Sequence, residues 1–128
     1  MKYAFSEEWT LKAKELIVTL ELAHIDAERV SCIKSYGTKT RRTIARIHGL
    51  GKAVQLGMKT RPFYVIELLS EKFDSQSAEE QTKTLIHELL HIPAGFGGGF
   101  RHHKPYVNTR TVEEQWRKLL ANSVLQKE

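Results

Sequence analysis

Residues 77–91 read SAEEQTKTLIHELLH, and this stretch decides the expected fold. Ser77 and Glu80 have the spacing of a capping box, in which two side chains each accept a hydrogen bond from a backbone N–H at a helix start. No Gly or Pro interrupts the residues that follow them in the stretch. The pattern predicts a helix from about residue 78 to residue 91, which ends before Pro93 because proline disfavours the helical conformation in its predecessor.

Three residues near the end of this helix, His87, Glu88 and His91, form the pattern HExxH. Residues i and i+4 project from the same face of a helix, so both imidazoles can bind one ion. Glu88 lies about 100° around the helix from His87, where its carboxylate can accept a proton from a metal-bound water. Zinc suits this chemistry because it lowers the pKa of that water to about 7 and polarises the attacked carbonyl. The alternative interpretation is two histidines that only pack or hydrogen-bond near a helix end.

A catalytic zinc usually takes three protein ligands and keeps one position for water. The third ligand is expected after the glycine-rich segment 95–99, which lets the chain turn sharply and can act as a flexible rim. His102 and His103 lie 11 and 12 residues beyond His91, and spacing alone leaves both open. Two isolated histidines are expected to be surface or core residues instead: His24 and His48.

The stretches outside this helix predict an α+β fold. Residues 7–23 have the apolar spacing of an amphipathic helix, and residues 111–126 predict another. Between the first helix and residue 77, β-favouring runs separated by Gly or Pro predict a small antiparallel sheet. These strand candidates are residues 30–36, 43–48, 53–56 and 63–69. The last of them is the most hydrophobic, and is expected either at an edge that binds a peptide or at the centre of the sheet.

Composition limits the class of protein and gives weaker indications of its partners. The 128 residues have a net charge of +5 and a pI of about 9.4. Lys and Arg gather between Lys34 and Arg61 and again between Arg101 and Lys118, which weakly favours nucleic acid as a partner. A solvated face rich in Lys is the commoner cause of such a charge balance. A single cysteine, Cys32, excludes an intrachain disulfide, and no apolar run is long enough to span a membrane. We expect one domain over residues 1–128 with a cytoplasmic location.

Further stretches carry a resemblance that goes beyond the HExxH pattern. They are ARIHGL at 45–50, YVIE at 64–67, FD at 73–74, LIHELLHIP at 85–93, FGGGFR at 96–101 and HKPYVN at 103–108. Together they resemble the SprT-like minimal zincins, and more closely the small phage and archaeal zinc metallopeptidases. The resemblance implies a minimal zincin-like fold and a bound Zn²⁺. It also favours His103 over His102 as the third ligand, because the matching family position follows an Arg and one further residue.

Other polar residues have two possible roles each. Tyr106 is expected to pack its ring or to donate its hydroxyl to a developing oxyanion. Arg101 is expected to hold a substrate carbonyl or to pair with Glu113. Asp74 or Glu67 is a candidate to orient a ligand imidazole.

The predicted function is a zinc metallopeptidase that hydrolyses peptide bonds in a peptide or protein substrate, with a zinc-bound water activated by Glu88. The alternative is a non-catalytic module that binds zinc or nucleic acid through a basic surface. Replacing Glu88 distinguishes the two functions. It should abolish peptide hydrolysis by a peptidase but leave binding by a non-catalytic module unchanged.

Overall fold

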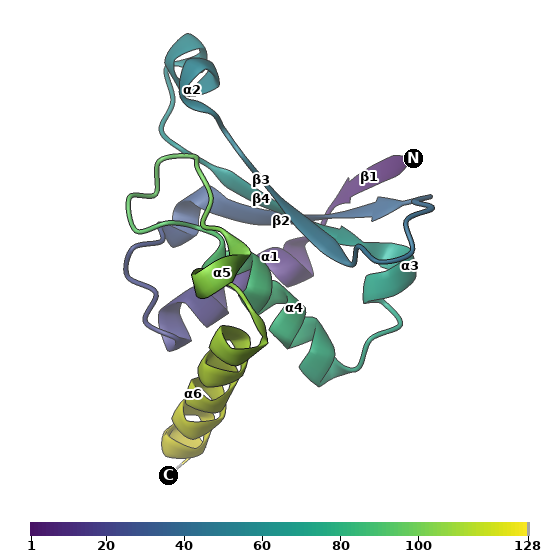
Figure 1. Cartoon of the computed structure of the whole chain (residues 1–128), viewed down its shortest axis with the longest axis vertical. Helices are drawn as coiled ribbons and strands as arrows, with labels where there is room; N and C mark the ends of the chain where they lie inside the picture. Colours follow the sequence, from purple (N-terminus) through teal and green to yellow (C-terminus); the bar gives the residue numbers. More distant parts are fainter. Residues whose placement is uncertain (128) are drawn as a thin grey trace.

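The computed structural model describes the backbone of residues 1–127 and the side chains of residues 1–122. It has the α+β fold class predicted from the sequence (Figure 1). The elements are β1 (Lys2–Phe5), α1 (Glu7–Thr19), η1 (Ala27–Arg29), β2 (Val30–Tyr36), β3 (Ala45–Gly49), α2 (Lys52–Met58), β4 (Tyr64–Leu69), α3 (Ser70–Phe73), α4 (Ala78–Leu90), α5 (His103–Tyr106) and α6 (Thr109–Lys127). Within the described part of the chain, no helix is both long and apolar enough to cross a membrane.

The sheet is mixed, so the prediction of an antiparallel sheet was wrong in this respect. Its strand order is β1-β2-β4-β3, with β2 and β4 parallel and the other two pairs antiparallel. The mixed sheet results from the position of β4, which lies between β2 and β3. β4 is strongly apolar, and its Tyr64, Ile66 and Leu68 are completely buried. A strand of this kind gains most from neighbours on both sides. β4 therefore lies inside the sheet, between β2 and β3, and β3 forms one of the two edges.

The segment 53–56, predicted as a strand, is part of the helix α2 instead. None of the α2 residues is buried, and Leu56 is 82% exposed. The apolar residues of this segment therefore do not pack into the core. The prediction of a strand was wrong because it rested on periodicity alone. The side chain of Gln55 hydrogen-bonds to the carbonyl oxygens of Leu50 and Gly97, which connects α2 to the glycine-rich segment. The short strand β1 was not predicted.

The core lies between one face of the sheet and the helices α1 and α4. Figure 1 shows α1, α4 and α6 on the same side of the sheet, while α2 projects away from the body. The capping box predicted for α4 is present, with Ser77 Oγ accepting from Glu80 N and Glu80 Oε1 accepting from Ser77 N, both at 3.2 Å. Leu85, Ile86 and Leu89 are completely buried. Their packing fixes the rotation of α4, and with it the direction of the HExxH side chains.

Candidate metal centre

Three histidines from two different elements converge beside the sheet. His87 and His91 lie on α4 and His103 begins α5, and each offers a ring nitrogen within 4.8 Å of those of the other two. The ring centroids are 4.8 to 5.5 Å apart. His102 is not part of this group. The structure therefore brings together the three histidines that the sequence proposed as ligands.

The orientation of His91 is fixed by a backbone group. Its Nδ1 lies 2.9 Å from the carbonyl oxygen of Arg101, which can only accept, so Nδ1 carries the hydrogen. The neutral ring then presents Nε2 as its lone-pair donor, the form that a metal ligand needs. Sequence reasoning sought this orienting group among carboxylates and missed it, because a backbone carbonyl leaves no trace in residue types.

The glycine-rich segment is held in place by the residues it passes. The hydroxyl of Tyr64 accepts from Gly98 N at 2.8 Å and donates to the carbonyl oxygen of Gly99 at 2.7 Å. Gly98 has φ +101°, and a Cβ there would lie 2.1 Å from the carbonyl oxygen of Leu50. Only glycine fits such a position. The segment expected to be a flexible rim is thus anchored, and it leads directly to His103.

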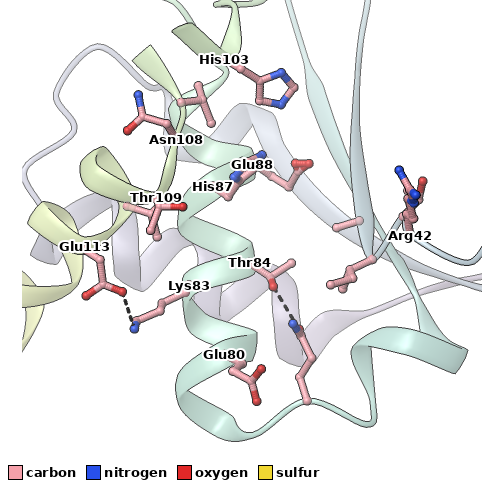
Figure 2. Close-up of a pocket in the computed structure, with 16 residues that line it drawn as sticks. Arg42, Glu80, Lys83, Thr84, His87, Glu88, His103, Asn108, Thr109 and Glu113 are labelled. Carbon is pink, nitrogen blue, oxygen red and sulfur yellow. Dashed lines mark hydrogen bonds and ion pairs between the residues drawn. The ribbon is translucent and has the colours of Figure 1, made fainter. Parts of the chain in front are cut away.

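The three histidines lie where two clefts meet. The larger cleft has a volume of about 680 Å³ and runs between β3, α4 and α6. The smaller has a volume of about 430 Å³ and continues past β3 towards His102. Ala45, His87, Glu88 and His103 line both. Figure 2 shows His87 and Glu88 projecting from α4 into the larger cleft, with His103 near them.

Comparison with protein families identifies a match to this chain. The sequence model of a family described as "Putative phage metallopeptidase" matches residues 1–123. The chain belongs to this family. Searches of curated proteins and of solved structures returned no match. The resemblance to the small phage metallopeptidase family is therefore confirmed. Membership implies a metal ion, which the three histidines could hold.

Burial sets the protonation of the three-histidine site. It lowers the pKa of His87 to about 4, and the charges of His91 and His103 act in the same direction. At neutral pH the His87 ring is therefore neutral and able to act as a ligand. Burial also raises the pKa of Glu88 to about 7. Glu88 is 5% exposed, and its Oε2 has no hydrogen-bond partner within the described residues.

The other residues singled out in the sequence are not part of the group of three, although Arg101 lines the smaller cleft and its carbonyl oxygen accepts from His91. His24 Nε2 is 3.2 Å from the carbonyl oxygen of Ile92. Glu113 pairs with Lys83 at 2.6 Å rather than with Arg101, which stacks on the ring of Tyr106 at 5.2 Å.

Neither proposed carboxylate orients a ligand imidazole. Asp74 pairs with Lys34 at 2.8 Å. Glu67 accepts a hydrogen bond from His48 Nε2 at 2.8 Å and lies 3.4 Å from Arg46 Nε. The prediction that one of these two carboxylates orients a ligand imidazole was therefore wrong.

Proposed function

We propose that this metallopeptidase is a zinc enzyme in which His87, His91 and His103 hold the ion and Glu88 is the general base. The observation that carries the proposal is the convergence of three imidazoles from α4 and α5 beside one buried carboxylate. Three protein ligands with one position left for water is the usual composition of a catalytic zinc site.

The chemistry of the donor set fits zinc. Zinc binds neutral imidazole nitrogens readily, and its filled d shell imposes no preferred coordination geometry. Burial lowers the pKa of His87 to about 4 and also lowers the pKa of His91, which favours the neutral ligand form of both rings. The hydrogen bond from His91 Nδ1 to the Arg101 carbonyl leaves Nε2 free for the ion. Hard cations such as Mg²⁺ and Ca²⁺ prefer oxygen ligands, which this group of three histidines does not offer.

Bound zinc would supply Lewis acidity, which polarises the scissile carbonyl and makes water a stronger acid. Glu88 then has two tasks. Its unpaired Oε2 accepts the proton of the attacking water, and the same carboxyl returns a proton to the departing amine. In the metal-free protein burial raises the pKa of Glu88 to about 7, so this carboxyl can gain and lose a proton close to neutral pH.

The edge of β3 is the proposed binding position for the substrate backbone. The carbonyl oxygen of Ile44 and the N–H of Leu50 both bond towards β4. Because backbone groups alternate along a strand, those of Ala45 and Ile47 point to the open edge. A peptide that adds to this edge as a further strand passes over the clefts at His87 and Glu88.

A cleavage assay tests the proposal. Wild-type protein and the Glu88→Gln variant, both loaded with zinc, are incubated with an unfolded protein, and new amino termini are counted. We expect cleavage by the wild type that stops with chelator and a loss of at least about a hundredfold in Glu88→Gln. Equal cleavage by both proteins would refute the role of Glu88, and zinc binding without cleavage by either would favour the non-catalytic zinc-binding module.

A further inference from the structure

The charges of this chain are divided sharply along the sequence. Residues 29–66 contain nine Lys and Arg and not one Asp or Glu, whereas all 15 acidic residues of the chain lie outside this segment. The net charge of +5 is therefore the sum of a strongly basic segment and a weakly acidic remainder. The basic segment contains β2, β3 and α2 and the loops that join them.

The basic segment borders the face of the sheet that the helices leave open. Alternation along β4 turns Ile66 and Leu68 into the core and Val65 and Glu67 to the opposite face. The register places Phe5, Ile33, Glu67 and Arg46 in one row across the four strands, so their side chains share that opposite face. In Figure 1 the helices α1, α4 and α6 all lie on the other side.

Among the residues of the four described strands, one carboxylate lies on this face, and it is paired with an arginine. Glu67 is 3% exposed and is covered by His48 and Arg46, which are themselves exposed. The loop between β2 and β3 adds Lys39 and Arg41, both exposed, at the end of the sheet. The open face therefore presents positive charge to solvent without a competing free carboxylate among these residues.

Two aromatic rings stand on the same face at its other edge. Tyr3 and Phe5 of β1 are 62% and 65% exposed. They are two residues apart on one strand, so the rings are separated by about 7 Å along it. Exposed apolar side chains that lie together on a protein surface often mark a binding site.

We propose that the open face of the sheet binds single-stranded nucleic acid. Bases stack on Tyr3 and Phe5, and the phosphates lie along Arg46 and the loop carrying Lys39 and Arg41. An acidic protein would satisfy the charges but would leave the rings without flat partners, whereas every base has a face that stacks. The metal centre lies on the helix side of β3, and Arg46 also lines the smaller cleft beside His87 and Glu88.

The test is binding of a fluorescein-labelled oligothymidylate, followed by anisotropy across a series of salt concentrations, with chelator present. We expect the logarithm of the association constant to fall linearly with the logarithm of the salt concentration. The slope should be about −0.7 for each phosphate contacted. The double variant Lys39→Ala/Arg41→Ala should weaken binding and reduce that salt slope. The double variant Tyr3→Ala/Phe5→Ala should weaken binding by about tenfold or more while leaving the slope unchanged.

The matched control removes two charges from elsewhere on the molecule. Lys12 and Arg117 are exposed residues of α1 and α6, on the helix side of the sheet. The variant Lys12→Ala/Arg117→Ala should bind as the wild type does. Circular dichroism of each variant checks that the fold is retained, and the two test variants change different elements, so misfolding of one leaves the other decisive.

Three outcomes would overturn the proposal. The first is an absence of binding at low salt, and the second is equal weakening by the control variant. The third is a duplex or a polyglutamate chain that competes as well as the single strand does, since neither offers unpaired bases. Because binding is measured with chelator, these outcomes are independent of whether the metal centre cleaves peptides.

Discussion

His91 and Arg101 are joined by two hydrogen bonds in opposite directions. The backbone N–H of Arg101 donates to the carbonyl oxygen of His91 at 2.7 Å, and Nδ1 of His91 donates to the carbonyl oxygen of Arg101 at 2.9 Å. This pair ties the end of α4 to the chain just before His103. The ligand at the helix end and the ligand after the loop are therefore held as one unit.

This arrangement predicts that the backbone of the loop controls metal binding. In Gly98→Ala the new methyl group would meet the carbonyl of Leu50 at a backbone conformation that alanine rarely adopts. We expect the loop to move and zinc affinity to fall by about tenfold or more, the size seen when a group that orients a ligand is lost. Competition with a coloured zinc chelator measures this affinity.

Gly97→Ala is the matched control for that prediction, because a Cβ at Gly97 would meet nothing within 4 Å. We expect its zinc affinity to stay close to that of the wild type. Equal losses in both variants would show that loop flexibility, and not the close contact at Gly98, determines zinc affinity.

The open edge of β3 predicts a specific effect of proline. Ala45→Pro removes an N–H that points away from β4, so the sheet keeps its internal hydrogen bonds. Loss of one substrate hydrogen bond should raise KM for a long peptide by about fivefold with little change in zinc content. Ala45→Ser keeps the N–H and should behave as the wild type. An unchanged KM in the proline variant would exclude this edge as the binding position.

The buried carboxylate predicts how the stability of the zinc-free protein depends on pH. Burial raises the pKa of Glu88 from its ordinary value of 4.5 to about 7. The folded state therefore holds this proton more tightly than the unfolded chain, and stability present below pH 4.5 is lost as pH rises through about 7. Glu88→Gln cannot lose a proton, so we expect it to have the higher Tm at pH 8 and a smaller advantage at acidic pH.

Thermal unfolding of both proteins with chelator, from acidic to mildly alkaline pH, measures this difference. A constant difference in Tm across the range would contradict the account, since it would mean that Glu88 does not titrate differently in the folded state.

Sequence reasoning succeeded where local rules decide the structure. The capping box of Ser77 and Glu80 predicted the start of α4, and helical spacing placed His87 and His91 on one face. It was less successful for the sheet. The central place of β4 depends on which strand gains most from two neighbours, and that is a property of the whole fold.

The parts of the site that were missed involve backbone groups and long-range packing. The carbonyl of Arg101 orients His91, and the hydroxyl of Tyr64 holds the loop before His103. Any residue supplies a carbonyl, and a tyrosine in an apolar strand predicts only a core position. For these interactions the three-dimensional structure was necessary.

The most direct test of the central claim is the zinc content of purified protein after incubation with zinc and removal of the excess, measured by elemental analysis. The wild type, His87→Ala, His102→Ala and His103→Ala are compared. We predict about one zinc per chain in the wild type and in His102→Ala, and strong loss in the other two. A wild type that stays free of zinc, or a His103→Ala variant that keeps it, would contradict the proposed metal centre.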